Sequence, residues 1–72
     1  MSLSRGVYQH IQSGKLYQVV EVARKLDQPY HYVVVYKQLY ESTLRGTNID
    51  LPYGTCWVRD VSEFKVKFVR KE

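Results

Sequence analysis

The sequence predicts an all-β fold in which five short strands form one small, bent sheet. No stretch carries apolar residues at helical spacing over three turns, while β-branched residues and seven tyrosines supply most apolar positions. Glycine, proline and asparagine divide the chain into short segments. Seventy-two residues are too few for a two-sheet sandwich of the usual size, whereas a sheet that closes on itself also hides its edges.

The first predicted strand covers residues 5–12, where apolar and polar side chains alternate. Residues 1–4 are expected to be disordered or poorly ordered, so that one domain spans residues 5–70. Ser13-Gly14 predicts a two-residue hairpin turn, because glycine readily adopts the positive φ that such a turn requires.

This turn fixes the expected pairing of the first strand with a second one over residues 15–24. Opposite side chains share a face of the sheet, which gives one cluster from both strands. The cluster consists of Tyr8, His10, Tyr17 and Val19, with Tyr8 opposite Val19 and His10 opposite Tyr17. The apolar phase changes partway along residues 15–24, as it does when a β-bulge inserts one residue.

The rest of the chain predicts two connections and one more long strand before the C-terminal region. Residues 25–30 form a turn, in which Pro29 cannot donate a ladder hydrogen bond. Residues 31–40 are rich in β-branched and aromatic side chains and predict the third strand. Residues 41–55 read as a long connection because they contain several strand-breaking residues.

The C-terminal region predicts a strand, one turn and a last strand. Residues 56–60 form the fourth strand, and residues 65–70 alternate as the fifth. Between them, residues 61–64 predict one short 3-10 turn, with Asp60 as its N-cap and Glu63 as its capping-box partner. Four strands, a short helical turn and a last strand are the layout of an SH3-like barrel.

The expected core uses large side chains because so small a domain buries little area. It consists of Tyr8, Val19, Val34, Tyr36, Trp57 and Phe64. A buried tyrosine hydroxyl needs a hydrogen-bond partner, and His10 or Arg59 is expected to supply one. Cys56, beside Trp57, is expected to be a small buried apolar residue.

An ordered set of short motifs resembles domain-of-unknown-function family 1653, a bacterial family of short proteins. The motifs span nearly the whole chain, from about residue 6 to residue 69. They are Gly6-x-Tyr8-x-His10, Gly14-x-x-Tyr17-x-Val19, Ala23-Arg24, Val34-Val35-Tyr36-x-x-Leu39-Tyr40 and Trp57-Val58-Arg59-x-x-x-x-Phe64. The resemblance implies a small SH3-type barrel, and it brings no established activity with it.

Several classes of function are not expected from the composition. The lone Cys56 cannot form an internal disulfide, and the N-terminal residues are too short and polar for a signal peptide, so a cytoplasmic protein without a membrane partner is expected. Two histidines and one cysteine fit no zinc spacing, and the glycines form no phosphate loop. We therefore expect no metal, no cofactor, no catalytic residues and no enzymatic activity.

The leading hypothesis is a binding module that contacts a protein partner through an aromatic and basic groove. Aromatic side chains on a small barrel commonly line such a groove. The candidate groove residues are His10, Tyr17, Tyr40, Tyr53 and Arg59. His10 either contacts a ligand or forms a hydrogen bond with a tyrosine hydroxyl. Arg59 either binds an anion or covers an aromatic ring with its guanidinium.

The alternative hypothesis is weak nucleic-acid binding, because the net charge is +4 and the pI about 9.3. The candidate basic patch consists of Lys65, Lys67, Arg70 and Lys71. The charge is not concentrated, since residues 1–36 have four basic and two acidic residues and residues 37–72 have seven and five. A regulatory or accessory role, with residues 41–55 as the contact, is the third possibility.

Overall fold

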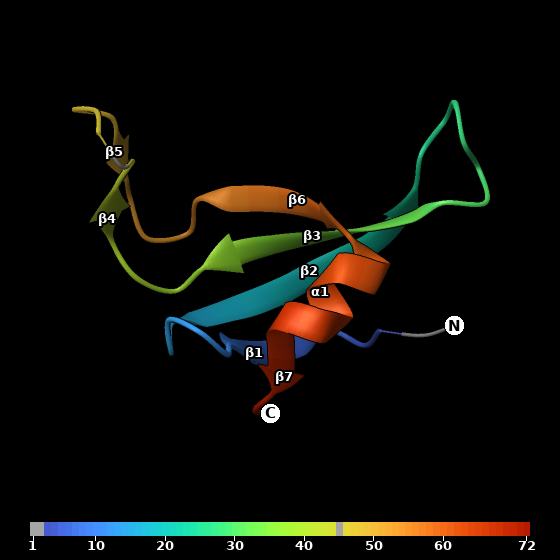
Figure 1. The fold of residues 1–72 in the computed structure, drawn as a ribbon, viewed down its shortest axis with the longest axis horizontal. Helices are drawn as coiled ribbons and strands as arrows, with labels where there is room; N and C mark the ends of the chain where they lie inside the picture. The colour runs from blue at the N-terminus through green and yellow to red at the C-terminus, as the bar shows by residue number, and fades with distance from the viewer. Residues whose placement is uncertain (1–2, 45) are drawn as a thin grey trace.

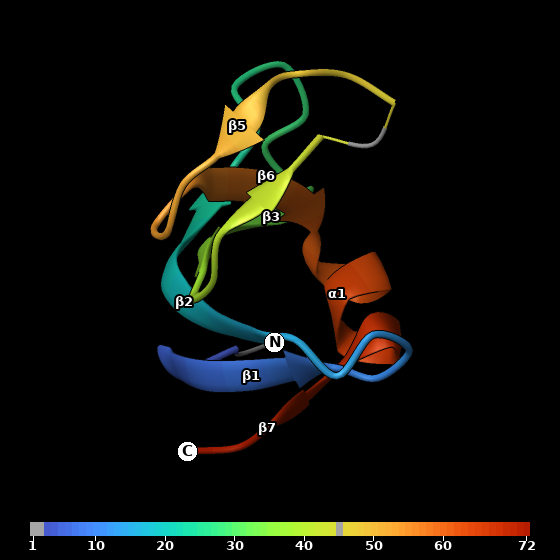
Figure 2. The ribbon, with the colours of Figure 1, turned by 90° about the vertical axis from the view of Figure 1, so that its left-hand side faces the viewer.

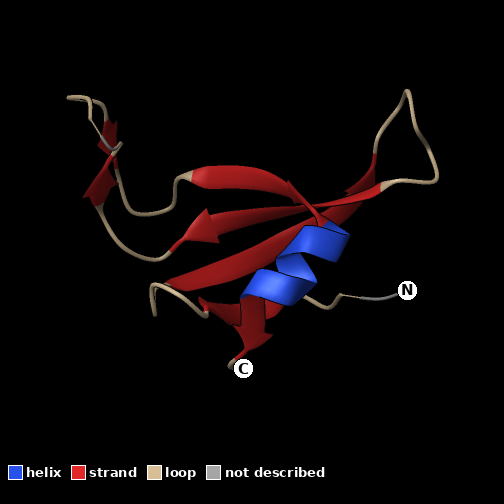
Figure 3. Ribbon diagram, in the orientation of Figure 1, coloured by secondary structure: helices blue, strands red, loops and turns tan. Residues whose placement is uncertain are grey.

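A computed structural model describes residues 3–44 and 46–72 of the chain, and strands form most of its regular structure (Figure 3). The elements in chain order are β1 (Gly6–His10), β2 (Leu16–Arg24), β3 (Tyr32–Gln38), β4 (Ser42–Thr43), β5 (Asp50–Leu51), β6 (Cys56–Asp60), α1 (Val61–Lys67) and β7 (Phe68–Arg70). The all-β prediction is confirmed. The described residues contain no helix long and apolar enough to cross a membrane.

Five strands form one antiparallel sheet in the order β6-β3-β2-β1-β7. The first and last strands of the chain are therefore neighbours, and β6 and β7 are the two edges. In the described part of the chain these edges do not pair with each other, so the sheet is bent and open (Figure 1). The helix α1 connects the two edge strands.

The bend of the sheet follows from the predicted irregularity in β2. Val19 pairs with Tyr36 but Glu21 pairs with Val35, which leaves Val20 as one extra residue in β2. A bulge of this kind increases the local twist of a strand and bends it. Figure 2 shows the resulting curve of β2, with α1 on its concave side. The β-bulge prediction is confirmed.

The register of the first hairpin differs from the prediction. Tyr8 pairs with Tyr17 instead of Val19, and Gly6 takes the place opposite Val19. The shift amounts to two residues, so every side chain keeps its face. The predicted cluster of the two tyrosines with Val19 and His10 therefore still shares one face of the sheet.

The cause of the shift is a four-residue turn in place of the predicted two-residue turn. The His10 N–H donates to the Lys15 carbonyl at 2.9 Å, and the Gly14 N–H donates to the His10 carbonyl at 2.8 Å. The Ser13 hydroxyl lies 2.9 Å from Nδ1 of His10 and accepts from the Lys15 N–H at 3.2 Å. These side-chain bonds stabilise the wider turn, in which Gly14 has a φ of +76°.

The C-terminal region differs from the prediction in its helix. The strand over residues 56–60 is confirmed, but α1 is a seven-residue α-helix instead of a 3-10 turn over residues 61–64. The last strand has only three residues, and residues 65–67 belong to the helix. The longer helix follows from the packing of Phe64 and Phe68, because both side chains enter the core and their rings stack with centroids 4.0 Å apart.

The predicted capping box at the start of α1 is wrong. Asp60 occupies the N-cap position, but its side chain makes no capping hydrogen bond. Its Oδ2 instead lies 3.5 Å from Nε2 of His31. Glu63 does not reach back to the cap, because its Oε1 accepts from Nη1 of Arg59 at 2.8 Å.

The long connection over residues 41–55 contains a two-stranded sheet that the sequence reading does not predict. Ser42 pairs with Leu51 and Thr43 with Asp50, which makes β4 and β5 a small hairpin. Residue 45, between these two strands in the sequence, lies outside the described residues. Figure 1 shows this hairpin projecting from one end of the main sheet.

The core is a cluster of aromatic and branched side chains between the concave face of the sheet and α1. Its buried members are Tyr8, Val19, Val34, Tyr36, Val61, Phe64 and Phe68. Five of the six predicted core residues are therefore buried, while Trp57 is half-buried and packs against the cluster. The predicted core omits Val61, although residues 61–64 are predicted as a helical turn, and it omits Phe68, which is predicted in a strand and directly follows the helix.

The hydroxyls of the buried tyrosines are paired. Nε of Arg59 donates to the Tyr36 hydroxyl at 3.1 Å, which confirms that expectation for Arg59. The Tyr8 hydroxyl donates to the Ser4 carbonyl at 2.9 Å. Of the expected N-terminal tail, residues 1–2 lie outside the described residues, whereas Leu3 packs against the core and Ser4 makes this bond.

We predict that Phe64→Ala lowers the free energy of unfolding by about 3–5 kcal/mol, because the ring is fully buried and fills the centre of the core. Urea denaturation followed by circular dichroism measures the loss. Val66→Ala is the matched control, since Val66 lies on the same helix but is 75% exposed, and it should change stability by less than about 0.5 kcal/mol. A loss below about 1 kcal/mol for Phe64→Ala would contradict the proposed core.

Candidate binding site

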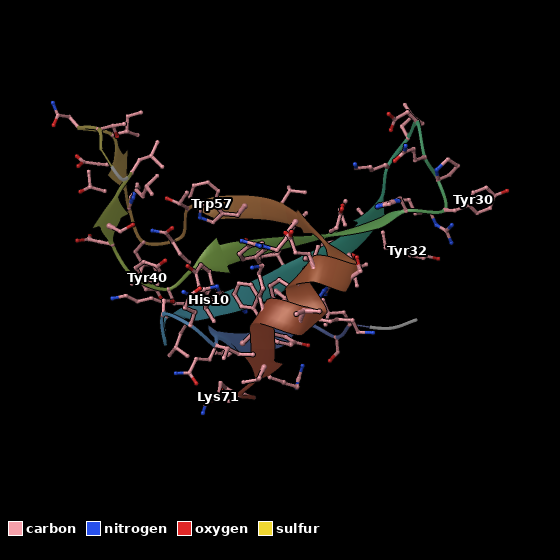
Figure 4. All side chains as sticks on the ribbon, in the orientation of Figure 1. His10, Tyr30, Tyr32, Tyr40, Trp57 and Lys71 are labelled. Atoms are coloured by element: carbon pink, nitrogen blue, oxygen red, sulfur yellow. The ribbon has the colours of Figure 1, made fainter. Side chains whose placement is uncertain are left out.

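A pocket of about 280 Å³ lies between the concave face of the main sheet and the β4–β5 hairpin. Four aromatic rings, one guanidinium, one amide and small hydroxyl and aliphatic groups line it. The lining residues are Tyr17, Tyr36, Gln38, Tyr40, Ser42, Thr43, Leu44, Leu51, Trp57 and Arg59. Figure 4 shows Tyr40 and Trp57 at the same end of the molecule, where the hairpin leaves the sheet.

Tyr17 is the central ring of this pocket. It meets the rings of Tyr36, Tyr40 and Phe68 edge to face, with centroids 5.3–5.4 Å apart. Its hydroxyl is hydrogen-bonded to the hydroxyl of Tyr40. Burial, followed by this bond, raises the pKa of Tyr17 above its usual value of about 10, so the phenol stays protonated at neutral pH. The hydroxyl bond and the edge-to-face contact join the two tyrosine rings into one wall of the pocket.

Gln38 is the buried polar residue that holds the pocket together. Its Nε2 donates to the carbonyls of Tyr40 and Leu51 at 3.0 Å each, and its Oε1 accepts from Nε1 of Trp57 at 2.9 Å. One side chain thus connects the end of β3, the hairpin strand β5 and the edge strand β6. An unpaired buried amide costs about 1–3 kcal/mol, so these segments are stabilised in the positions that satisfy it.

Arg59 forms the charged border of the pocket. Besides bonding to the Tyr36 hydroxyl, it donates to Glu63 at 2.8 Å, and its guanidinium lies 5.8 Å from the Phe68 ring centroid. The hydrogen bond to Tyr36, followed by the charge of Glu63, raises the pKa of Arg59 further above its usual value. The guanidinium is therefore a fixed positive group that covers a core ring, which is one of the two expected roles of Arg59.

Three of the five predicted groove residues line this pocket together, namely Tyr17, Tyr40 and Arg59. His10 does not line it. The His10 ring packs edge-on against Phe68 at 4.9 Å and bonds to Ser13 instead of a tyrosine hydroxyl. Burial, and then the charges of Arg59 and Lys67, lower the pKa of His10. Tyr53 is 62% exposed and is not part of the pocket lining.

The predicted basic patch does not form one strand face. Lys65 and Lys67 lie on α1, while Arg70 lies on β7. Nη1 of Arg70 donates to the Ser4 hydroxyl at 2.7 Å, so this side chain binds the N-terminal segment to β7. Figure 4 shows Lys71 near the C-terminus, far from Tyr40 and Trp57.

A second pocket, also of about 280 Å³, lies at the other end of the molecule. The loop between β2 and β3 and the first turns of α1 form it. Its lining residues are Tyr30, His31, Tyr32, Val61, Ser62 and Lys65. Tyr30 is 93% exposed, and Figure 4 shows it projecting from the loop. The sequence reading treats this loop only as a turn.

Gln38 is the important residue that sequence reasoning missed, although a signal for it exists. Strand residues of equal parity share a face, so Gln38 lies on the same face as the core residues Val34 and Tyr36. A glutamine on a core face requires several hydrogen-bond partners. Cys56 is a second difference, because it is exposed on the edge strand β6 instead of buried.

The main pocket presents aromatic rings and hydrogen-bonding groups. Its lining holds three phenols, an indole, a satisfied amide, the hydroxyls of Ser42 and Thr43 and one paired guanidinium. In residues 3–44 and 46–72, no group of three or more His, Cys, Asp and Glu side chains is arranged to hold a metal ion. Comparison of the chain with protein-family models, curated proteins and solved structures found no match.

We predict that Gln38→Leu destabilises the fold by at least about 2 kcal/mol, because it leaves the Trp57 indole N–H and two carbonyls without their partner. Amide exchange at Ser42 and Leu51 should also become faster than in the wild type. Gln12→Leu, in the exposed hairpin turn, is the matched control and should change neither quantity. Equal hairpin exchange rates in Gln38→Leu and wild type would show that Gln38 does not hold β4–β5.

Proposed function

We propose that this chain is a non-enzymatic binding module that receives a segment of a protein partner in the pocket between the main sheet and β4–β5. The observation that carries this is the fixed arrangement of its lining by Gln38 and by the Tyr17–Tyr40 hydroxyl bond. A site that is already ordered loses little conformational entropy on binding. The cytoplasmic location expected from the lone cysteine is part of the same proposal.

The dimensions and chemistry of the pocket favour a peptide side chain over a cofactor. Cofactor and drug-sized sites usually have volumes of about 300–1,000 Å³, and this pocket is at the lower limit. Tyr, Trp and Arg are the residue types that most often dominate the free energy of protein–protein contacts. Tyr40, Trp57 and Arg59 supply all three types within one lining. An apolar or aromatic side chain fits between the rings, with a polar neighbour at Arg59.

For the architecture, we propose an SH3-like barrel that is incompletely closed, as in the family 1653 that the sequence resembles. Three features support it: the last strand pairs with the first, the middle strand β2 bends at a bulge, and one short helix joins the two edge strands. In such a barrel the loops at one end surround a ligand site. The pocket beside β4–β5 occupies that kind of position.

We predict that Tyr40→Ala weakens binding of a selected peptide at least tenfold, because it removes one wall of the pocket and the partner of the Tyr17 hydroxyl. The peptides are selected from a displayed random library against the wild-type chain. Fluorescence of Trp57 measures their affinity, since this is the sole tryptophan and it lines the pocket.

Tyr53→Ala serves as the control for this measurement. Tyr53 is an exposed tyrosine in the connection over residues 41–55 and lies outside the pocket lining, so its loss should leave the affinity within twofold. Peptides that bind equally well to wild type and to Tyr40→Ala, or a library that gives no binder, would contradict the proposed site.

A second candidate function is weak binding of single-stranded nucleic acid at the loop between β2 and β3. The observation that favours it is the pocket in which Lys65 lies beside the exposed ring of Tyr30 and the ring of Tyr32. Bases stack on exposed aromatic rings, and a lysine beside them neutralises a phosphate. This differs from the sequence hypothesis, since only Lys65 of the predicted basic patch takes part.

We predict for this candidate that affinity for a labelled twelve-nucleotide single strand falls as salt rises, with a log–log slope of about −0.7 for each phosphate contact. Lys65→Glu should weaken binding and make the slope smaller by about one contact. Lys15→Glu is the charge-matched control, because Lys15 lies over Tyr40 at the other end of the molecule. Fluorescence anisotropy without detectable binding at low salt would eliminate this candidate.

A further inference from the structure

The edge strand β6 is unpaired on one side throughout its length in the described chain. Its only neighbour in the sheet is β3, and Figure 1 shows it along the upper border of the sheet with no strand above it. Proteins commonly blunt such edges with very short strands, proline or covering segments. The opposite edge strand, β7, has three residues, whereas β6 has five and contains no proline.

The register identifies the backbone groups of β6 that face outward. The Gln38 N–H donates to the Thr55 carbonyl at 3.0 Å, so these two residues form a hydrogen-bonded pair. Such pairs alternate along an antiparallel ladder. Tyr36 with Trp57 is therefore the next bonded pair, and Cys56 and Val58 direct their N–H and carbonyl groups away from β3.

The β2–β3 ladder gives the same assignment independently. The Leu39 N–H donates to the Leu16 carbonyl at 3.0 Å, so odd-numbered residues at this end of β3 bond to β2. Even-numbered residues of β3 then bond to β6, as the Gln38 bond requires. Cys56 and Val58 are also both exposed, Val58 at 65%, so their outward backbone groups are accessible.

The side chains beside this edge define the chemistry of a strand that could join it. Cys56 is opposite Lys37 and Val58 is opposite Val35, so these four side chains share the outer face of the sheet. Lys37 takes part in none of the three ion pairs of the described residues. On the inner face, Trp57 and Arg59 belong to both the edge strand and the pocket.

We propose that an extended segment of the protein partner pairs with the free edge of β6 as an additional strand, with a carboxylate beside Lys37 and Cys56 and an apolar residue beside Val58. These two positions are two residues apart, because alternate side chains of a strand share a face. The residue between them points to the inner face and enters the pocket beside Trp57. The inference rests on the proposed function, since it specifies the conformation and charge of the same partner segment.

Two distances support this arrangement. Neighbouring strands lie about 4.8 Å apart, so an added strand has its backbone about 10 Å from that of β3. A lysine and a glutamate side chain together bridge that distance. The net charge of +4 also favours an acidic partner over a basic one.

The test uses two capped eight-residue peptides. One has glutamate–leucine–valine at its centre and the other has valine–leucine–glutamate, with threonines on both sides. Both orders are needed because the added strand can run in either direction. Amide hydrogen exchange of the full chain is measured with and without saturating peptide. We expect exchange at Cys56 and Val58 to slow at least tenfold, while Trp57 and Arg59, already bonded to β3, change less than twofold.

A charge exchange provides the second measurement and does not depend on unfolding. Lys37→Glu should weaken binding of the glutamate peptide at least fivefold and strengthen binding of the same peptide with lysine in place of glutamate. A matched pair of variants compares the two edges of the sheet. Val58→Lys on β6 should lose peptide binding, whereas Val69→Lys on β7 should keep it.

Three outcomes would overturn the inference. Binding that alters Trp57 fluorescence but leaves the exchange of Cys56 and Val58 unchanged would reject the added strand and leave the pocket proposal intact. Peptides that change neither readout would reject strand addition, while the library selection decides the pocket separately. In the third outcome, amide exchange at Cys56 and Val58 slows when the protein concentration rises without peptide, and sedimentation detects dimers. This would assign the edge of β6 to a second copy of this chain.

Discussion

The arrangement of the pocket between the main sheet and β4–β5 depends on the hydrogen bonds of one buried amide. Gln38 lies on the core face of β3 with 1% of its surface exposed. Its amide group is satisfied because the chain passes through β4 and β5 and then places two partners beside it. These partners are the Leu51 carbonyl and the Trp57 indole N–H. A hydrogen bond in a low-dielectric interior is strong, and its absence is costly. The amide therefore favours the one placement of the hairpin that satisfies it.

The aromatic core sets the second constraint, and it explains why the last segment is helical. So small a domain has space for few core residues, and rings give the largest apolar area for each residue. Phe64 and Phe68 stack on each other, which a helix that ends between them permits. The same cluster continues through Tyr36 and Tyr17 to the pocket. The pocket wall is thus the outer part of the core, and its rigidity comes from the packing inside.

The sequence predicts the local features that depend on side-chain period and fails where distant hydrogen bonds decide. The strand over residues 56–60 and the bulge in β2 follow from alternation and from its change of phase. The hairpin register does not, because the Ser13 hydroxyl stabilises a wider turn than glycine alone suggests. In residues 65–70 the alternation of charged and apolar side chains indicates a strand, yet the burial of Phe64 and Phe68 requires a helix before β7.

In the candidate site as well, residue types can be predicted from the sequence, whereas contacts between distant segments cannot. Residue type and the expected barrel fold predict Tyr17, Tyr40 and Arg59 as groove residues, and they line one pocket because β2, β3 and β6 are neighbours. His10 and Tyr53 have equally suitable side chains, but a bond to Ser13 holds the first and exposure separates the second. Residue type identifies the candidate residues, whereas topology decides which of them lie together.

In the proposed strand addition, the position of β6 explains how one surface would provide both affinity and selectivity. Backbone groups at a strand edge bind any extended chain, so they supply affinity with little discrimination. Discrimination comes from side-chain pockets beside the edge and from charges that exclude the wrong partner. Trp57 and Arg59 connect the edge to the pocket, and Lys37 adds a charge on the opposite face. Because Gln38 holds the Trp57 indole, the amide that orders the hairpin also fixes the side chain where edge and pocket meet.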